Sequence, residues 1–497
     1  MHLTHKDIDV LFVSPGNNKV IYQGLAKQYS AIEPPIWAGL LAKHTRNQGY
    51  GVDLVDQEAQ GLESEKIVEM AVDMNPRIVV VLVYGQQPSA STQNMTMAGE
   101  ICSVFHQNSH HLKTIMIGGH PSALPEDTLE NNKVDFVCQG EGVETLDALL
   151  KIRDLLDKTQ LAKVPGLWYE FNGKPKFTFP ANVISEQKLP KILPGMAWDL
   201  LPMGAYRAHN WHCFESIDER QPYATIYTSL GCPFKCNFCC INAPFGKPSI
   251  RYWDPNFIIT ELDILANKYN VKNIKISDEM FVLQEDHVMR LCDLIIERGY
   301  NFNFWAYARV DTVKDCFLEK LKKAGFNWLC LGIESGSKHV RDGALKGRFT
   351  ENDIYKVVKK IQDAGIYIIA NYMFGLPDDN YESMEETLNL SKELNCEWAN
   401  FYSGMAYPGS KLYDMALQKD WALPEKWHDF SQHSYKQLPL PTEYLSAGQV
   451  LSFRDNAWQE YFTNQKYLDM IQSKFGKQVL DHINELSAHK LKRKYAA

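Results

Sequence analysis

The sequence predicts an α/β chain in which a doubly wound parallel sheet is followed by a partial barrel of β/α units and a helical C-terminal region. Strand and helix patterns alternate five times in the first part of the chain, and six further strand–helix units begin at Tyr223. A length of 497 residues suggests about three domains, or two with appendages. We expect four segments, which span residues 1–155, 156–220, 221–410 and 411–497.

The first domain is predicted from short apolar strands that alternate with helical patterns. Residues 78–83 are a continuous apolar run, which suits a strand buried on both faces of a parallel sheet. Strands are predicted at 8–13, 52–55, 78–83, 114–117 and 134–137, and helices at 35–48, from Ser64 to 75, after Ser89 and at about 144–155. Five such units indicate a Rossmann-like sheet, whose ligands lie at the carboxyl ends of the strands. Those ends carry Ser14, Tyr84, Gly85, Gly118, Gly119, Gly140 and Glu141.

The rest of the chain divides into three parts. Asn172-Gly173 between two strand-like runs predicts a hairpin at the start of a proline-rich connector. Barrel strands are predicted at 225–228, 274–279, 302–309, 328–335, 367–374 and 398–403. Repeated strand–helix units with polar strand ends indicate a barrel or partial barrel with its active site at the C-terminal mouth. Beyond Gly409 the pattern is helical and aromatic, and we expect this region to close the mouth and set specificity.

Composition excludes several classes of protein. Hydrophobic residues make up 45% and charged residues 23%, as in ordinary globular chains. A net charge of −8 argues against a sequence-independent nucleic-acid binder, and the one dense basic segment, 489–494, is expected to be a solvated helix end. The longest apolar run, 78–84, is too short to span a membrane, and residues 1–7 lack the apolar core of a signal peptide. The sequence therefore predicts a cytoplasmic protein with no membrane or nucleic-acid partner.

One cysteine cluster carries the strongest chemical signal. Cys232, Cys236 and Cys239 follow a predicted strand at spacings of four and three, and soft thiolates in this pattern favour an iron–sulfur cluster or zinc. A structural zinc site needs a fourth ligand, and the adjacent Cys240 points awkwardly for the same metal. Three ligands on a four-iron cluster leave one iron open for catalysis. Zinc and a chance group of core cysteines remain the alternatives.

Several motifs together resemble a known family. The loop from Gly231 to Cys239, with Phe238 before its last cysteine, resembles the signature of the radical S-adenosylmethionine (SAM) superfamily. Blocks at 332–337, 375–377 and 407–410 resemble the subgroup whose barrel follows a cobalamin-binding domain, the class B radical SAM methyltransferase-like family, and blocks at 118–121, 125–126 and 140–142 resemble that domain itself.

The resemblance implies a specific chemistry. Cys232, Cys236 and Cys239 would be the catalytic and metal-binding residues that hold a 4Fe–4S cluster, whose open iron chelates SAM. One electron, from a reductant such as flavodoxin or ferredoxin, would cleave SAM to a 5′-deoxyadenosyl radical that takes a hydrogen atom from a small-molecule substrate. The expected cofactors are therefore the 4Fe–4S cluster, SAM and cobalamin.

The resemblance also suggests residues for each cofactor. The SAM-binding candidates are Phe238, Ser277, Asp278, Glu279, Arg309, Glu334, Ser335, Gly375 and Leu376. Arg309 and Glu334 could instead pair with each other or with neighbours, and Asp278 and Glu279 could cap a helix or face solvent. The cobalamin candidates are the sheet-end residues Ser14, Tyr84, Gly85, Gly118, Gly119, Gly140 and Glu141. Their glycines could instead serve only tight strand–helix turns.

The cobalamin assignment has one irregularity. Many cobalamin domains carry a histidine ligand for cobalt in a loop after the first strand, and no histidine follows Ser14 at that point in this chain. His120 comes after the fourth strand and is expected to pack, or to contact the cofactor's phosphate tail. We therefore expect cobalamin to bind without a protein histidine below cobalt; the alternative is a domain that has lost the cofactor.

The sequence thus predicts an enzyme that most resembles a C-methyltransferase acting on an unactivated carbon. A cobalamin-dependent cyclisation, ring contraction or other rearrangement without methyl transfer is the second hypothesis. A methylthiotransferase resembles the chain less, because the upstream cysteines are scattered. A cobalamin or iron–sulfur sensor without enzymatic activity is the non-enzyme alternative. The sequence does not identify the substrate.

Overall fold

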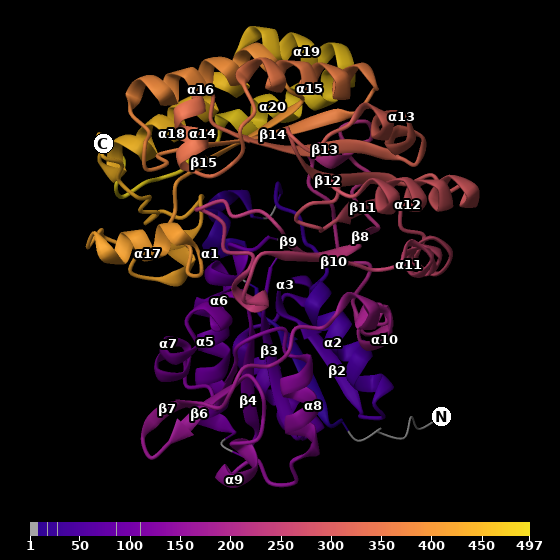
Figure 1. The fold of residues 1–497 in the computed structure, drawn as a ribbon, viewed down its shortest axis with the longest axis vertical. Coiled ribbons are helices and arrows are strands. Elements are labelled where there is room, and N and C mark those ends of the chain that lie inside the picture. Colours follow the sequence, from indigo (N-terminus) through magenta and orange to yellow (C-terminus); the bar gives the residue numbers. More distant parts are fainter. Residues whose placement is uncertain (1–7, 17, 27, 86, 110) are drawn as a thin grey trace.

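The structure, a computed structural model, describes residues 8–497 except 17, 27, 86 and 110. Residues 1–7, where we predict no signal peptide, lie outside the described residues. Two α/β halves are stacked along the long axis of the molecule, with the N-terminal half below and the C-terminal half above (Figure 1). No helix in the described part of the chain is long and apolar enough to cross a bilayer.

The N-terminal half is built on the predicted doubly wound sheet. Its parallel strands are β1 (Val10–Ser14), β2 (Val52–Asp56), β3 (Ile78–Val83), β4 (Lys113–Gly118) and β5 (Phe136–Cys138), in the order β2-β1-β3-β4-β5. The helices include α2 (Ile36–Asn47), α4 (Ser64–Met74), α5 (Ala90–Asn108) and α8 (Val143–Lys151). Residues of β3 alternate between two separate apolar clusters, one against α2 and α8 and the other against α4 and α5. The continuous apolar run of β3 is therefore explained by burial on both faces.

The predicted hairpin belongs to this first sheet. Strand β6 (Leu167–Phe171) pairs antiparallel with β5, and β7 (Lys174–Phe177) pairs with β6, which makes a seven-stranded sheet. Asn172 and Gly173 have φ angles of 54° and 75°, as a tight hairpin turn with two left-handed residues requires. The Asn-Gly signal predicted the turn, but nothing local predicted the pairing of the hairpin with β5.

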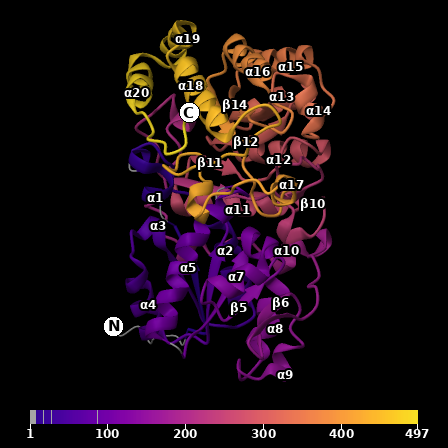
Figure 2. The ribbon, with the colours of Figure 1, turned by 90° about the vertical axis from the view of Figure 1, so that its left-hand side faces the viewer.

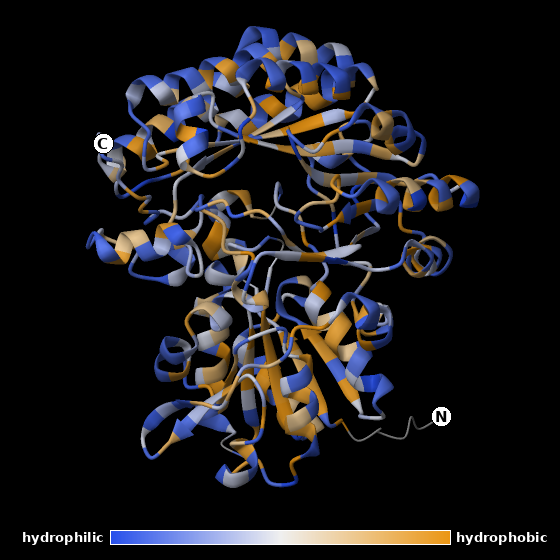
Figure 3. Ribbon diagram, viewed as in Figure 1, coloured by the Kyte–Doolittle hydropathy of each residue, from blue (hydrophilic) through white to orange (hydrophobic). Residues whose placement is uncertain are grey.

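The C-terminal half contains the predicted partial barrel. All six strands are parallel and run in the order β15-β14-β13-β12-β11-β8. They are β8 (Tyr223–Ile226), β11 (Asn273–Ile276), β12 (Asn303–Arg309), β13 (Phe326–Glu334), β14 (Tyr367–Phe374) and β15 (Trp398–Ser403). The outer helices include α11 (Pro255–Tyr269), α12 (Glu285–Arg298), α13 (Asp315–Lys323), α15 (Glu351–Asp363) and α16 (Tyr381–Leu394). Apolar residues gather in the strands and on the inner helix faces, whereas the outer faces are polar (Figure 3).

The C-terminal region is helical, as predicted, and contacts both halves. Helices α18 (Ala447–Phe462), α19 (Gln465–Phe475) and α20 (Lys477–Ala488) cover the barrel beside β15, and α20 lies above α1 (Asn18–Tyr22) of the N-terminal half (Figures 1 and 2). Helix α17 (Lys411–Gln418) is followed by a single turn, Trp427–Phe430, which packs on α5. The region therefore bridges the two halves.

The basic tail corrects one expectation. The last helix ends at Ala488, before the basic segment, and the Arg493 side chain is only 3% exposed. Its guanidinium donates to both carboxylate oxygens of Asp455, at 2.8 and 3.0 Å. The prediction of a solvated helix end was therefore wrong for Arg493. Its partner is a partly buried carboxylate in a distant helix, which no local pattern predicts.

Gly118, which ends β4, offers a test of this packing. A Cβ atom there would lie 2.1 Å from the Val83 carbonyl oxygen, whereas one at Gly204 would meet nothing within 4 Å. We expect Gly118→Ala to lower the free energy of unfolding by roughly 1–3 kcal/mol or more, as overpacking against backbone does, and Gly204→Ala to change it little. Thermal unfolding followed by circular dichroism measures both. Equal melting temperatures for the two variants would show that β3 and β4 can separate.

Candidate functional site

The cysteine loop begins on a rigid hairpin. Strand β9 (Ser229–Cys232) pairs antiparallel with β10 (Ser249–Tyr252), and Cys232 lies opposite Ser249. Gly231 has a φ of 88°, and a Cβ on it would be 2.5 Å from the Ser249 carbonyl oxygen, so this position requires glycine. The first of the three cysteines is therefore fixed by backbone pairing.

Asp278, just beyond β11, anchors the turn that leads into this hairpin. It is fully buried, and its carboxylate accepts hydrogen bonds from the Thr228 backbone N–H at 2.6 Å and the Ser229 hydroxyl at 2.7 Å. The Thr228 hydroxyl also donates to it. Burial raises the pKa of Asp278 to about 6, against the opposing effect of these hydrogen bonds. Asp278 thus neither caps a helix nor faces solvent; it positions the start of the cysteine loop.

The three cysteines lie close enough to influence one another's ionisation. The pKa of the Cys232 thiol is raised to about 11, mainly by burial and to a smaller extent by Glu279 and Cys236. Burial also raises the pKa of Cys239 well above its ordinary value, with smaller contributions from Cys240, Glu279 and Cys232. Cys240 itself is buried. Among the described residues, no group of three His, Cys, Asp or Glu side chains is close enough together to hold a single metal ion. A 4Fe–4S cluster needs wider spacing, because each cysteine holds a different iron.

Arg309 and Glu334 each pair with a neighbour rather than with one another. Arg309 is bonded to Asp311 at 2.8 Å, and Glu334 accepts from Lys346 at 2.6 Å. One N–H of the Arg309 guanidinium also points to the Cys236 sulfur, at 3.5 Å. Arg309 donates to the Lys346 backbone oxygen as well, so both ion pairs belong to one network beside the cysteine loop.

Glu334 has an unusual backbone. Its φ is 68°, in the left-handed region that non-glycine residues rarely adopt, and the pairing of β13 with β14 shifts register just before it. Such strain concentrates at functional sites. Glu334 is also one of the residues that line the cavity described below.

Three other SAM-binding candidates have structural partners instead. The Ser335 hydroxyl is bonded to Thr387 at 3.1 Å, and a Cβ on Gly375, whose φ is 77°, would meet Val450 of α18 at 2.4 Å. Leu376 packs in a small apolar cluster beside Phe238. None of the three lines the cavity, and their role in SAM binding stays a prediction.

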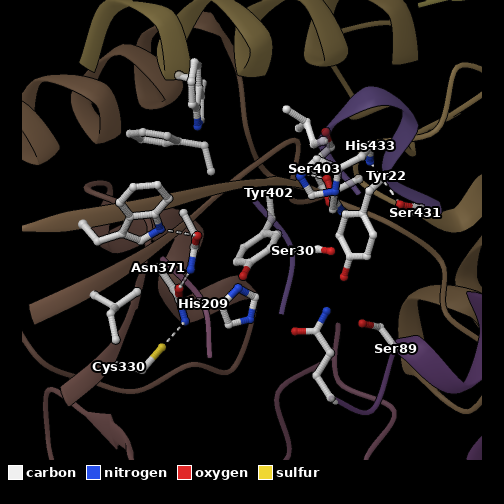
Figure 4. A pocket seen from close by; sticks show the side chains of 18 of the residues that line it. Tyr22, Ser30, Ser89, His209, Cys330, Asn371, Tyr402, Ser403, Ser431 and His433 are labelled. Carbon is white, nitrogen blue, oxygen red and sulfur yellow. Dashed lines mark hydrogen bonds between the residues drawn. The ribbon is translucent and has the colours of Figure 1, made fainter. Parts of the chain in front are cut away.

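A cavity of about 620 Å³ lies between the two halves, inside the barrel mouth (Figure 4). Of the predicted residues, Phe238, Cys239, Glu279 and Glu334 line it. Burial raises the pKa of Glu279 to about 8. The lining residues that the sequence analysis missed include Tyr22, Ser30, Ser89, His209, Cys330, Asn371, Tyr402, Ser403 and His433. They come from distant segments, so only the fold brings them together.

A chain of hydrogen bonds crosses three strands of the cavity wall. The indole N–H of Trp398 donates to Asn400 at 3.0 Å, Asn400 donates to Asn371 at 2.9 Å, and Asn371 points its amide N–H to the Cys330 sulfur at 3.1 Å (Figure 4). Asparagines at inward positions of otherwise apolar strands are a sequence pattern from which this polar part of the cavity wall could have been predicted.

The predicted cobalamin residues lie where the first sheet faces the cysteine loop. Tyr84, Gly85 and Gly119 line a narrow space of about 30 Å³ together with Gly231 and Cys240. A second space of about 70 Å³ is lined by Ser14 and Tyr84 from the first half and by Ser277 from the barrel. Ser277, a SAM-binding candidate, thus lies beside the cobalamin candidates rather than in the main cavity.

Buried polar atoms at this edge are left without partners. The Tyr84 hydroxyl, the Ser277 hydroxyl and the His120 Nε2 make no hydrogen bond to any described residue. Such atoms are costly unless a ligand or water satisfies them, and the amide groups around a corrin ring can do so. The donors at this edge therefore fit cobalamin.

The glycines and Glu141 are engaged in the protein itself. Cβ atoms on Gly85 and Gly118 would clash with Ala90 and Val83, which agrees with the tight-turn alternative. Gly140, with a φ of 133°, has only Ala181 near its Cβ position. Glu141 forms a buried ion pair with Arg251 of β10 at 2.8 Å. Glu141 thus joins the two halves.

His120 packs against other side chains, which was one of the two roles predicted for it from the sequence. Its ring meets Trp427 edge-on at 4.5 Å, and its Nδ1 lies 3.2 Å from the Thr92 hydroxyl. Burial lowers the pKa of His120 to about 3, so the imidazole is neutral. The Trp427 turn of the C-terminal region therefore covers this edge of the first sheet.

Comparisons with known families agree with this arrangement. The B12-binding domain model matches residues 22–150, and the radical SAM superfamily model matches residues 226–391. The chain is a radical SAM enzyme with a B12-binding domain. Its cofactors are SAM, a 4Fe–4S cluster and cobalamin.

Similar proteins span most of the chain. An uncharacterized methyltransferase of Pyrococcus horikoshii is 28% identical over 80% of this chain and 82% of its own length. The anaerobic magnesium-protoporphyrin IX monomethyl ester cyclase of Rubrivivax gelatinosus is 23% identical over 92% of this chain and 78% of its own. The cobalamin-dependent SAM radical enzyme OxsB, solved with aqua-cobalamin and SAM, is 17% identical with a TM-score of 0.68, over 97% of this chain and 72% of its own, which shows a shared fold.

Asp278 provides a test of how the cysteine loop is positioned. We expect Asp278→Ala to reduce iron and sulfide content after anaerobic reconstitution several-fold, because three buried donors lose their acceptor at about 1–3 kcal/mol each. Asp263→Ala, which removes a carboxyl bonded to Arg298 outside the barrel, is the control and should retain normal iron. Normal iron content in Asp278→Ala would show that the loop forms without this anchor.

Proposed function

We propose that this enzyme methylates an unactivated carbon of a small-molecule substrate by cobalamin-dependent radical SAM chemistry. The observation that carries the proposal is the cavity of about 620 Å³ between the halves. Phe238 and Cys239 of the cysteine loop contribute to its wall, and Tyr22 and the segment 87–89 contribute from the B12-binding half. A substrate in this cavity would contact both cofactor-binding parts of the chain.

The proposed cofactor ligands follow from the donors present. Cys232, Cys236 and Cys239 would hold the 4Fe–4S cluster, and Ser14, Tyr84 and the edge glycines would border cobalamin. When bound, the cluster supplies the electron that cleaves SAM, and cobalamin supplies methyl-transfer chemistry. The chain's own residues bind, orient and exclude water. Contact between oriented reactants can supply roughly 7–11 kcal/mol of a barrier.

Different residues would position SAM. Phe238, Glu279 and Glu334 line the cavity, so they are the candidates for direct contact. Arg309, the last residue of β12, contacts the cysteine loop through its guanidinium, which packs 3.8 Å from the centre of the Phe234 ring and donates toward the Cys236 sulfur. We therefore assign Arg309 to positioning the loop. Ser335, Gly375 and Leu376 would act only through the turns that they stabilise.

One further partner and a location in the cell are proposed on chemical grounds. Cleavage of SAM needs one electron, so a one-electron reductant such as flavodoxin or ferredoxin is required. The thiol-rich centre suits a reducing compartment, which agrees with the cytoplasmic location predicted from the sequence.

The alternative reaction is a cyclisation or rearrangement without methyl transfer. It is supported by the similarity to the protoporphyrin cyclase. Methylation is supported by the relatives named as methyltransferases or methylases, which include the one from Pyrococcus horikoshii and a hopanoid C-3 methylase of Methylococcus capsulatus.

The cluster ligands are tested by single substitutions. Cys232→Ala, Cys236→Ala and Cys239→Ala should each abolish the cluster's absorbance and the cleavage of SAM, because each removes one of three ligands. Cys240→Ala is the matched control and should keep both, since adjacent residues cannot easily serve one cluster from the same loop. Loss of the cluster in Cys240→Ala together with its retention in Cys239→Ala would overturn the assignment.

The reaction type is tested by counting products. Radical methylation consumes two SAM molecules per turnover, and we expect S-adenosylhomocysteine and 5′-deoxyadenosine to form together with a substrate that gains one methyl group. Mass spectrometry of an anaerobic reaction containing methyl-labelled SAM measures all three. A modified substrate that carries no label, with 5′-deoxyadenosine alone, would establish the rearrangement instead.

A further inference from the structure

One wall of the cavity is formed by Arg454 of α18. Arg454 is only 6% exposed. Its guanidinium makes hydrogen bonds within the protein: Nε donates to the Phe401 carbonyl oxygen and Nη1 donates to Asp455, both at 2.7 Å. The second terminal nitrogen, Nη2, has no hydrogen-bond partner among the described residues. A buried guanidinium that lines a cavity with an unused nitrogen is a site for an acceptor.

The charge around Arg454 is unbalanced. Asp455 serves two guanidiniums, because Arg493 donates to the same carboxylate. Of the three other carboxyl groups that line the cavity, Glu33 pairs with Lys275 and Glu334 pairs with Lys346, and Glu279 lies near the cysteine loop. One positive charge beside Arg454 is therefore left without a counterion in the cavity wall, which is unfavourable for buried groups unless an anion compensates it.

The surroundings of Arg454 are otherwise neutral. His433 lines the same end of the cavity, and burial together with Arg454 and Arg493 lowers the pKa of its imidazole to about 3. It can donate one hydrogen bond without adding charge. Phe401, Tyr402 and Trp458 supply apolar and aromatic surface close to Arg454. The ligand that fits has an anionic group and a flat or apolar body.

The position of Arg454 suits substrate rather than cofactor. Helix α18 packs on β15, which is one edge strand of the barrel sheet. The other edge strand is β8, which leads to the cysteine loop, and four strands lie between the two. Arg454, Phe238 and Cys239 line the same cavity, so a ligand held by its anionic group at Arg454 shares that cavity with the cysteine loop.

We infer that the substrate carries an anionic oxygen group, most simply a carboxylate, that binds to Arg454 at the α18 end of the cavity. The statement that this ligand is the substrate rests on the proposed function. The statement that Arg454 binds an anionic group does not. Arginine suits carboxylate and phosphate alike, because both present paired oxygens to its N–H groups.

Binding is tested on the full-length protein with matched probes. We would measure 3-phenylpropionate against 3-phenylpropionamide, and indole-3-propionate against its amide, by ligand-observed NMR. The acids should bind at least tenfold more tightly than the amides. Inorganic phosphate and acetate are added as competitors; displacement by phosphate but not by acetate assigns the site to a phosphate group.

Two variants and one control make the result specific. Arg454→Gln should abolish the preference for acids, and Arg454→Lys should keep part of it, because the charge remains. Arg290→Gln on α12, an exposed arginine bonded to Asn256, should behave as wild type. Melting temperatures establish that each variant is folded. Equal binding of acids and amides to the wild type, or an unchanged preference in folded Arg454→Gln, would overturn the inference.

The substrate itself provides the second test. The reconstituted enzyme is incubated with methyl-labelled SAM and a small-molecule extract of the organism that makes the protein, and the labelled product is applied to an anion-exchange resin at neutral pH. A retained product supports the inference, and a neutral or cationic product contradicts it. Absence of any labelled product contradicts methyl transfer, whereas the acid preference measured by NMR still decides the binding site.

Discussion

The cavity depends on a buried ion pair that joins the two halves. Lys275 of β11 donates to Glu33, which precedes α2, at 3.0 Å, and both side chains are at most 4% exposed. The Lys275 ammonium also lies 4.9 Å from the centre of the Trp305 ring, and Tyr223 donates to the same glutamate. Separating the halves would expose both of these charges. A buried pair contributes specificity of contact more than net stability, and here it joins two residues of the cavity wall that come from different halves.

The same constraint explains why several conspicuous polar residues are not free for cofactors. Glu141 and Arg251 form a second pair across the halves, and Asp278 is used by the turn before the cysteine loop. Charged residues at strand ends thus divide into two groups. One group holds the two halves and the loop in place, and the other, which includes Glu279 and Glu334, lines the cavity. The chemistry requires both, because a radical must be generated in contact with its target.

Local patterns predicted what local physics determines. The cysteine spacing, the apolar run of β3 and the Asn172-Gly173 turn each depend on a few adjacent residues, and the structure contains the corresponding loop, strand and hairpin. Motif glycines were harder to interpret. Gly375 has a positive φ and lies close to α18, and both features favour glycine at this position. From the sequence alone, such a backbone requirement cannot be distinguished from contact with a ligand. Asn371, Arg454 and the partner of Arg493 depend on strands and helices that meet only in the fold.

The C-terminal region connects specificity to the closure of the two halves. Arg493 binds Asp455 beside Arg454 and also donates to the backbone oxygens of Ser434 and Gln432. The adjoining segment reaches the N-terminal half, because Gln23 donates to the backbone oxygen of Lys492 at 3.2 Å. An anion at Arg454 would add a counterion to the cluster that this tail completes. Occupation of the cavity by an anionic substrate and retention of the tail over it would therefore favour one another, since the anion offsets the positive charge that Arg493 adds beside Arg454.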